Sequence, residues 1–304
     1  MRKAYPTKLL EFEHWFRTEE ACRDYLIKLR WPDGFQCPRC DCRQAWRTSR
    51  GLLHCGGCRK DTTVTAGTIF HRSRIPLRLW FRAMWHITSQ KSGMSALGLQ
   101  RVLGLGSYET AWTCLHKLRR AMVRPDRDLL SGAIEVDEIV VGGHVRGKGP
   151  HMVGNKGWVG VAVEVRGKGS GRVRMALMPD VATHDLVAFV QRVAAPGSKI
   201  ITDGRGGYSE VIRFGYSHYS LPFYGRPREE LDKLFPRVHR VSTLLKRWIL
   251  GIHHGRVSRK HLASYLDEYT FRFNRRRSID RGMLFWRLAQ QAVAVKPQTN
   301  KRLA

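Results

Sequence analysis

Acidic side chains are scarce in this chain. Its 304 residues include 25 Asp and Glu against 54 Lys and Arg, which gives a formal net charge of +29. The excess is spread over the whole length rather than held in one tail. A charge this far from neutral favours a polyanionic partner, and DNA or RNA is the natural candidate. The alternative is a basic surface that serves only solubility.

Long apolar runs and internal repeats are also missing. No apolar run reaches the length of a transmembrane helix, and the charged, then amphipathic N-terminus is unlike a signal peptide. Apolar residues still make up 42% of the chain, which allows real cores, and the length is enough for two or three domains. These features lead us to expect a cytosolic multidomain protein.

Cysteines are few, but four of the seven form two Cys-x2-Cys knuckles. Cys37 and Cys40 form the first knuckle, Cys55 and Cys58 the second, and fourteen residues lie between the two. Four soft ligands at this spacing are typical of a structural zinc ribbon, whereas two disulfides are the alternative. The other three cysteines are interpreted as ordinary thiols: Cys22, Cys42 and Cys114.

Helical spacing of apolar residues covers residues 8–30 and 76–123, on either side of the ribbon. In the second block a break at 104–106 is followed by Ser107, a plausible N-cap. A short glycine turn before a basic helix is the pattern of a helix-turn-helix, although any helical hairpin looks similar. The candidate DNA-binding residues lie off the apolar stripe of the last helix: Lys117, Arg119 and Arg120.

Strand-like sequence begins near residue 130. The expected order is three strands, a helix that Thr183 can cap, a further strand and then more helices. The four expected strands are 133–141, 158–165, 173–178 and 199–202, with a hairpin turn at 167–171 between the second and third. This order predicts a ribonuclease H-like α/β core with a mixed sheet and helices on its faces.

Asp137 lies in the middle of the first of these strands. Side chains two residues apart share a face of a strand, so Glu135, Asp137 and Ile139 point one way and Glu138 points the other. A carboxylate inside an apolar strand is costly unless something pairs with it, and a divalent metal is one such partner. The alternative is an aspartate at a strand edge that faces water.

Asp203 ends the fourth strand and precedes Gly204, so alone it would pass for an ordinary turn residue. In the expected topology the first and fourth strands are neighbours. Asp137 and Asp203 could then share Mg²⁺ ions about 4 Å apart.

His239 is the candidate for a third ligand. Thirty-five residues separate it from Asp203, and it begins a helix whose apolar stripe includes Val241, Leu245 and Trp248. His239 and Lys246 fall together on the opposite face of that helix. His239 therefore either faces solvent or belongs to a site. Three acidic residues could serve instead, although they resemble a solvated loop: Glu229, Glu230 and Asp232.

With these motifs in place, the chain resembles the insertion-sequence transposases that join a zinc ribbon to a DDE-type, ribonuclease H-like domain. The resemblance covers nearly the whole chain. Besides the ribbon it depends on these segments: 65–70, 136–138 with 142–143, 202–204, 244–248, 251–254, 265–269 and 271–276.

The resemblance implies that Asp137 and Asp203 are catalytic. The third residue of the family, often Glu and in some members Asn, corresponds to His239 here. Because Mg²⁺ prefers oxygen ligands and imidazole suits softer metals, this departure leaves two alternatives. Either His239 replaces the carboxylate as ligand or water-positioning group, or the copy is weakened.

What the resemblance implies for function is a DNA transposase that binds terminal repeats and catalyses metal-dependent strand cleavage and transfer. Its expected cofactors are structural Zn²⁺ and catalytic Mg²⁺ or Mn²⁺. Its expected partners are terminal inverted repeats, target DNA and further copies of the chain, as a homodimer or higher oligomer, in the prokaryotic cytoplasm near the nucleoid. The alternatives are a domesticated DNA-binding protein and a nuclease without joining activity.

The expected fold class is multidomain α+β. Its domains are an N-terminal helical segment (1–34), a zinc ribbon (35–72), a helix-turn-helix region (73–128), a ribonuclease H-like catalytic domain (129–290) and a basic tail (291–304). The expected phosphate contacts in the catalytic domain are Lys246, Arg247, Arg275 and Arg276, although the last two could equally form a solvated basic face.

Overall fold

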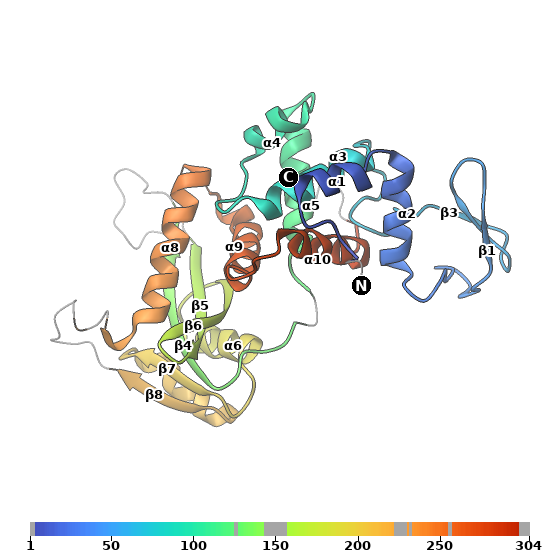
Figure 1. Cartoon of the computed structure of the whole chain (residues 1–304). Coiled ribbons are helices and arrows are strands. Elements are labelled where there is room, and N and C mark those ends of the chain that lie inside the picture. The colour runs from blue at the N-terminus through green and yellow to red at the C-terminus, as the bar shows by residue number, and fades with distance from the viewer. Residues whose placement is uncertain are drawn as a thin grey trace. The chain divides into compact units, whose positions relative to one another are not determined.

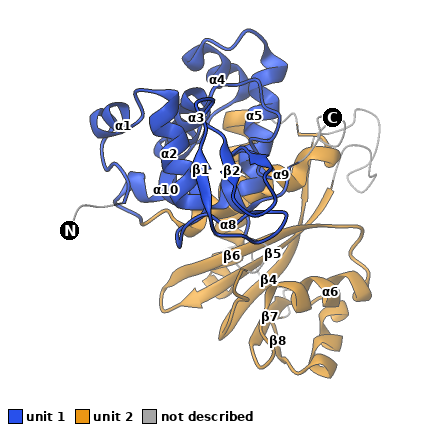
Figure 2. Cartoon of the chain, turned by 90° about the vertical axis from the view of Figure 1, so that its right-hand side faces the viewer, with its two compact units in different colours: residues 1–124, 278–304 blue, residues 125–277 orange. Residues whose placement is uncertain are grey.

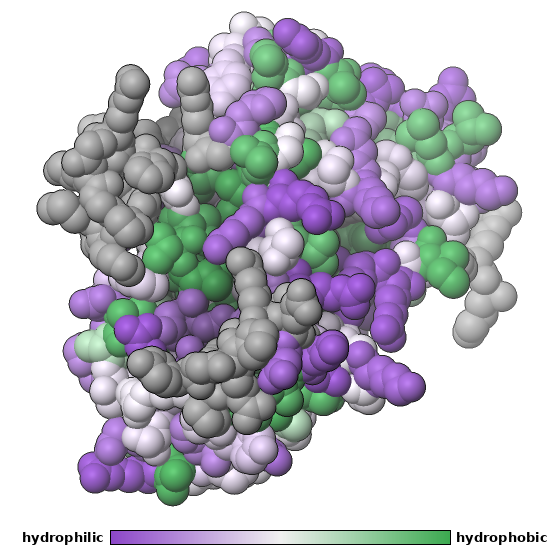
Figure 3. All heavy atoms as spheres, turned by 90° about the vertical axis from the view of Figure 1, so that its left-hand side faces the viewer, coloured by the Kyte–Doolittle hydropathy of each residue, from purple (hydrophilic) through white to green (hydrophobic). Residues whose placement is uncertain are grey.

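The chain divides into two compact units, coloured separately in Figure 2. Unit 1 comprises Met1–Arg124 and Ser278–Ala304, and unit 2 comprises Pro125–Arg277. The computed structural model describes residues 4–124, 127–142, 157–221, 230, 233–254 and 257–297. Hydrophilic side chains cover much of the face drawn in Figure 3. Across the described ranges, no helix combines the length and the apolar character needed to cross a bilayer.

Unit 1 consists of helices with one small sheet. The helices are α1 (Leu9–Trp15), α2 (Glu19–Arg30), α3 (Leu77–Ser89), α4 (Ala96–Leu103), α5 (Tyr108–Ala121) and α10 (Arg281–Ala294). The antiparallel sheet has the order β1 (Ala45–Arg47), β2 (Leu53–Cys55) and β3 (Asp61–Thr62). Thr18 begins α2 by accepting a hydrogen bond from the backbone N–H of Ala21, which satisfies one free donor of the first turn.

Aromatic side chains form the centre of unit 1. The ring of Phe285 on α10 lies 5.3 Å from that of Phe12 and 5.7 Å from that of Phe81, centroid to centroid. Gly282 lets α10 lie close to the backbone at Pro6, because a Cβ at this position would lie 1.7 Å from the carbonyl oxygen of Pro6. Helix α10 therefore belongs to unit 1. The catalytic domain expected over 129–290 ends earlier as a compact unit, at Arg277, because the apolar face of α10 packs on the N-terminal helices.

Helices α4 and α5 form a hairpin with a tight turn. Ser95 and Ser107 cap them by accepting hydrogen bonds from Gly98 N (3.0 Å) and Thr110 N (3.1 Å). Gly104 ends α4 with φ +64°, a left-handed conformation that glycine adopts without a steric cost. The turn and the cap expected from the sequence at 104–107 are thus confirmed.

Unit 2 contains a five-stranded mixed sheet with the order β6-β5-β4-β7-β8. The strands are β4 (Ala133–Val141), β5 (Gly157–Arg166), β6 (Gly169–Met178), β7 (Lys199–Asp203) and β8 (Ser217–Leu221). The first three are antiparallel, and β7 and β8 run parallel to β4. The expected α+β class with a mixed sheet is confirmed, as is the expectation that the first and fourth strands are neighbours.

Helices cover both faces of this sheet, and Figure 1 shows α8 and α6 on opposite sides of it. The helical elements of the unit are α6 (Thr183–Val193), the 3-10 helix η1 (Gly206–Phe214), α8 (Pro236–His253) and α9 (Arg259–Asn274). Ile139 and Val141 of β4 pack against α8 and α9, whereas Ile134 and Val136 pack against α6 and η1. Side chains therefore alternate between two cores along β4, as the sequence predicts.

Two details of unit 2 differ from the sequence prediction. Strand β8 was not expected, because most of its side chains are exposed and its sequence lacks an apolar run. Thr183 is the first residue of α6 rather than its cap; the N-cap is Ala182, which offers no side-chain acceptor.

Candidate functional site

The four knuckle cysteines meet at one point in unit 1. The Sγ atoms of Cys37 and Cys58 lie 3.7 Å apart, those of Cys40 and Cys55 lie 3.6 Å apart, and all four lie within 4.8 Å of one another. Zinc at the centre of a tetrahedron with Zn–S bonds of about 2.3 Å would place its sulfur atoms about 3.8 Å apart. The cluster therefore fits a zinc ion.

The small sheet and the glycines of the second knuckle shape this cluster. Ala45 pairs with Cys55 across β1 and β2. A Cβ on Gly57 would lie 3.0 Å from Cys42 Cβ and 3.4 Å from Cys40 Sγ, so glycine leaves room for the first knuckle and the residues that follow it. Hydrogen bonds from the backbone of Cys58 and then Gly57 help to lower the pKa of the Cys55 thiol to about 6, which favours the thiolate that binds metal. Cys42 stays outside the four-cysteine group, as expected.

Asp137 and Asp203 lie at matching positions on neighbouring parallel strands of unit 2. Glu135 of β4 pairs with Ile201 of β7, and two residues further along both strands come Asp137 and Asp203. The pairing ends at Glu135 and Ile201, and the charge of Asp203 acts on Asp137, so the two aspartates lie near each other just beyond the last paired residues. Ile201 packs toward α8 and α9, so alternation directs both carboxylates to that face.

Negative charge accumulates at this point of the sheet. Burial first, and then the nearby charges of Glu138 and Asp203, raise the pKa of Asp137 to about 7. His239 acts in the opposite direction, as does the backbone N–H of Glu138, which donates to Asp137 Oδ1 at 2.8 Å. A bound cation would favour the ionised carboxylates, so the electrostatics of the pair fit a hard divalent ion.

Glu135 holds helix α8 against the sheet. Its Oε2 accepts hydrogen bonds from the backbone N–H groups of Arg237 and Val238, both at 2.8 Å, and its Oε1 pairs with Arg237 Nη1 at 2.7 Å. A buried carboxylate at a helix N-terminus satisfies free N–H groups and the positive end of the dipole. This contact fixes the first turn of α8, where His239 lies.

On the opposite face of the sheet, Glu138 holds the segment that follows β7, as Glu135 holds α8. It accepts hydrogen bonds from the guanidinium of Arg205 and from the hydroxyl of Tyr208 at 2.8 Å. The backbone N–H of Arg205 in turn donates to Asp203 Oδ1 at 3.1 Å. Glu138 thus anchors the segment that follows β7 and helps to orient Asp203.

The third expected ligand, His239, lies near Asp137 but does not form a compact group of ligand atoms with the two aspartates. His239 is half-buried, its ring lies 5.6 Å from that of Phe235, and it is close enough to lower the pKa of Asp137. In the part of the chain that is described, only the four cysteines form a group of three or more His, Cys, Asp or Glu side chains close enough to hold a metal ion together. Of the alternative acids, Glu230 is exposed, and Glu229 and Asp232 lie outside the described residues.

Basic residues on α8 and α9 differ in their surroundings. Lys246 and Arg247 are exposed on α8, as a phosphate contact requires. Arg275 and Arg276 stack on Phe271 and Phe273, each guanidinium carbon 4.0 Å from the ring centroid. Both donate to carbonyl oxygens in the last turn of α9, so their first role is to end this helix.

On α5 one expected DNA contact is wrong. Arg119 is only 1% exposed, so its guanidinium is packed inside the protein rather than offered to a duplex. The apolar stripe used to place Arg119 outside was too narrow, because Cys114, His116 and Ala121 are buried as well. Lys117 and Arg120 are half-buried and retain access to solvent.

The sequence did not reveal which residues support Asp137 and Asp203, called the acidic pair below. Glu135 and Glu138 were assigned to faces but not to partners. Arg237 and Arg205 lie 102 and 67 residues from those carboxylates, and only the fold brings them together. The one available signal was the presence of three acidic side chains within an apolar strand, each of which needs a partner.

Comparison with known proteins agrees with this geometry. Residues 17–61 match the transposase zinc-ribbon domain, and residues 129–274 match the ISXO2-like transposase domain. Over 138 residues the chain is 27% identical to a Halobacterium salinarum protein named "Uncharacterized protein in transposable element ISH50". That alignment covers 44% of this chain and 45% of the relative, so the chain matches less than half of that protein's length. The resemblance found in the sequence is confirmed, and the chain belongs to the insertion-sequence transposases in which a zinc ribbon precedes an ISXO2-like transposase domain.

Proposed function

We propose that this protein is a DNA transposase that binds the terminal inverted repeats of its element and catalyses metal-dependent cleavage and transfer of a DNA strand. The observation that supports the proposal most is the parallel register of β4 and β7, in which Glu135 pairs with Ile201 and Asp137 and Asp203 follow two residues later on each strand. The family supports the same reaction class. The ribonuclease H-like character of unit 2 is part of this proposal.

Asp137 and Asp203 are the groups that would hold Mg²⁺ or Mn²⁺. When bound, such ions stabilise the attacking and leaving oxygens of an in-line displacement at phosphorus. His239 completes the site as a ligand or by positioning water. Glu135 and Glu138 keep α8 and the segment after β7 in place, so that the carboxylates remain preorganised for the transition state.

DNA binding is divided among several elements. We assign recognition of the terminal repeats to the zinc ribbon and the hairpin of α4 and α5. Lys246, Arg247, Arg275 and Arg276 would contact phosphates of the reacting strand or the target, in line with the net charge of +29. Two ends must be held together for transposition, so a homodimer or larger assembly on prokaryotic chromosomal DNA is part of the proposal.

The test is strand transfer with a substrate built from the inverted repeats that flank the gene. Asp137→Ala and Asp203→Ala should each lower joining more than about 100-fold, beyond what loss of an outer-shell partner costs. Duplex binding should stay nearly unchanged, because a carboxylate adds nothing to the attraction for phosphate. Asp180→Asn, at an exposed aspartate of the same unit, is the matched control. Joining by Asp137→Ala at the wild-type rate would refute the site assignment.

His239 supports a second candidate, a DNA-binding protein that has lost activity. An imidazole is a poor ligand for Mg²⁺. Wild-type protein that binds the repeats but neither cuts nor joins with Mg²⁺ or Mn²⁺ would favour this candidate. Cleavage without joining would favour a nuclease.

A further inference from the structure

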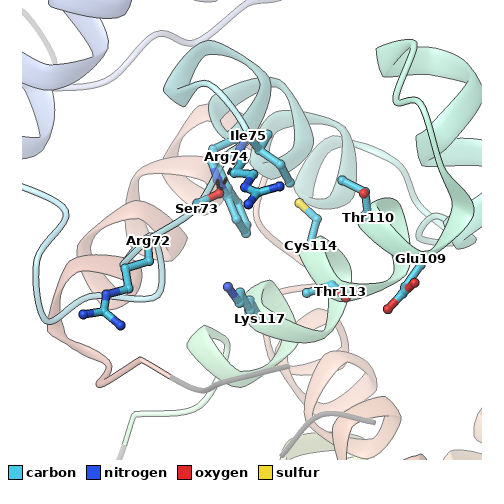
Figure 4. Close-up of a pocket in the computed structure, with 10 residues that line it drawn as sticks. Arg72, Ser73, Arg74, Ile75, Glu109, Thr110, Thr113, Cys114 and Lys117 are labelled. Atoms are coloured by element: carbon cyan, nitrogen blue, oxygen red, sulfur yellow. Dashed lines mark hydrogen bonds between the residues drawn. The ribbon is translucent and has the colours of Figure 1, made fainter. Parts of the chain in front are cut away.

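A second charged region lies in unit 1, far along the sequence from the acidic pair. It is a cavity of about 470 Å³ between α5 and the segment 72–75, which connects the zinc ribbon to α3 (Figure 4). Its lining residues are Arg72, Ser73, Arg74, Ile75, Trp80, Glu109, Thr110, Thr113, Cys114 and Lys117. Segment 72–75 and α5 form the two walls of this cavity, and each wall contributes cationic side chains and hydroxyls.

The wall formed by segment 72–75 is held firmly. Ser73 Oγ accepts hydrogen bonds from Trp80 Nε1 at 2.9 Å and from the backbone N–H of Ile75 at 3.1 Å. Trp80 is 1% exposed, so it anchors the segment to the core. Arg72 has φ +52°, a conformation that is costly for a residue with a side chain and is found where a structure imposes it.

The wall formed by α5 presents one face of the helix. Thr110, Thr113 and Lys117 recur at helical spacing, so their side chains face the same way. Partial burial lowers the pKa of Lys117, and the nearby Cys114 thiol acts in the opposite direction. An anion beside this ammonium would offset the cost of its burial.

The charges around the cavity are predominantly positive. Figure 4 shows the Arg74 guanidinium directed toward α5, while that of Arg72 is directed away from it. Glu109 is the one acidic residue in the lining. Segment 72–75 also borders a second cavity of about 490 Å³, whose lining includes Arg23 and Arg50. A strand that crosses this segment would meet cations on both of its sides.

We propose that the cavity between segment 72–75 and α5 binds a phosphate group of the DNA backbone. Arg74 offers a planar fork of donors, Lys117 a point charge and Thr113 a hydroxyl, which is the chemistry that recognises phosphate. The Thr110 hydroxyl lies 2.8 Å from Ser107 Oγ, with which it shares a hydrogen bond. The volume lies in the range of ligand sites and accommodates a sugar-phosphate segment. This proposal rests on the proposed function in that it takes DNA as the partner.

The test measures how duplex affinity depends on salt. The full-length protein is titrated with a 30-base-pair duplex of fixed sequence at several KCl concentrations. Arg74→Gln and Lys117→Gln should each weaken binding and reduce the slope of log affinity against log salt by about 0.9, the value for one lost phosphate contact. Arg74→Lys should keep the slope, because it keeps the charge. Lys28→Gln removes an exposed charge on α2 outside both cavities and should change the slope little.

Slopes for Arg74→Gln and Lys117→Gln that match the slope for Lys28→Gln would overturn the proposal. A free phosphate ligand is the other source of the same chemistry, and inorganic pyrophosphate is its probe. Saturable stabilisation of the wild type by pyrophosphate, lost in the cavity variants while their duplex slopes stay normal, would overturn the assignment to DNA.

Failure of this proposal can be distinguished from failure of the proposed function. The cavity variants should reduce the salt slope of duplex binding, whereas Asp137→Ala should keep the wild-type slope and not join. A wild-type protein that does not join would refute the proposed function, and the slope changes would still support the cavity.

Discussion

The three carboxylates of β4 have different surroundings. Glu135 meets the N-terminus of α8 and Arg237, and Glu138 meets Arg205 and Tyr208. For Asp137, among the described residues, no Lys or Arg ion pair is found, and its pKa is raised to about 7 by burial and neighbouring negative charge. The two outer carboxylates thus serve the fold, and the central one remains available for a cation.

His239 provides a prediction at the same scale. His239→Glu should keep or increase strand transfer with Mg²⁺, because it supplies an oxygen ligand where the chain has a nitrogen. The measurement is the ratio of joining rates with Mg²⁺ and with Mn²⁺, for which His239→Gln is the control without a charge. Complete loss of joining in His239→Glu with both metals would show that the imidazole itself has a specific role.

At the scale of elements, α9 carries a half-buried aspartate, Asp267, that acts on stability. Burial raises the pKa of Asp267 to about 6, although Arg127 and Arg192 attract the carboxylate and lower it in part. An unfolded Asp titrates near 3.9, so the folded state binds this proton more tightly than the unfolded state does. The contribution of this group to the free energy of unfolding is greatest below pH 4 and is lost as the pH rises through about 6.

Asp267→Asn should therefore stabilise the protein at pH 7.5, by on the order of 2 kcal/mol, and the gain should vanish near pH 4. Melting temperatures of the full-length chain across this pH range measure it. Asp180→Asn is the control, since this exposed side chain keeps the oxygen that accepts from Val181 N. A gain that does not depend on pH would contradict the account.

Elements with a strong local signal were predictable, and contacts between distant elements were not. The alternation in 133–141 predicted both faces of β4, and the glycine turn before Ser107 predicted the hairpin of α4 and α5. Strand β8 was missed because exposed polar residues form it, and its pairing with β7 decides its conformation. The catalytic domain expected over 129–290 included part of α10, because nothing local shows which core Phe285 enters.

In the candidate site, sequence alone identified the side chains but not their supports. The spacing of the four cysteines predicted their cluster, and the order of the strands predicted that β4 and β7, which carry Asp137 and Asp203, are neighbours. The partners of Glu135 and Glu138 are set by packing across the sheet, which leaves no local pattern. Burial of Arg119 likewise depends on how wide a face of α5 is covered.

At the scale of the whole molecule, the two units carry different kinds of site. Unit 1 holds the four-cysteine cluster, the α4–α5 hairpin and the cationic cavity, and unit 2 holds the acidic pair. A net charge of +29 attracts a polyanion to the protein as a whole, while the acidic pair would repel it unless a cation is present. Metal binding and DNA binding should therefore be separable by mutation.

The most direct measurement is a Mn²⁺ titration of the zinc-loaded protein, followed by the electron paramagnetic resonance signal of free Mn²⁺. Asp137 and Asp203 hold the ion jointly in this account, so Asp137→Asn and Asp203→Asn should each abolish the same tight site, while Asp180→Asn leaves it intact. Tight Mn²⁺ binding that survives either substitution would contradict the claim that the two carboxylates share one cation.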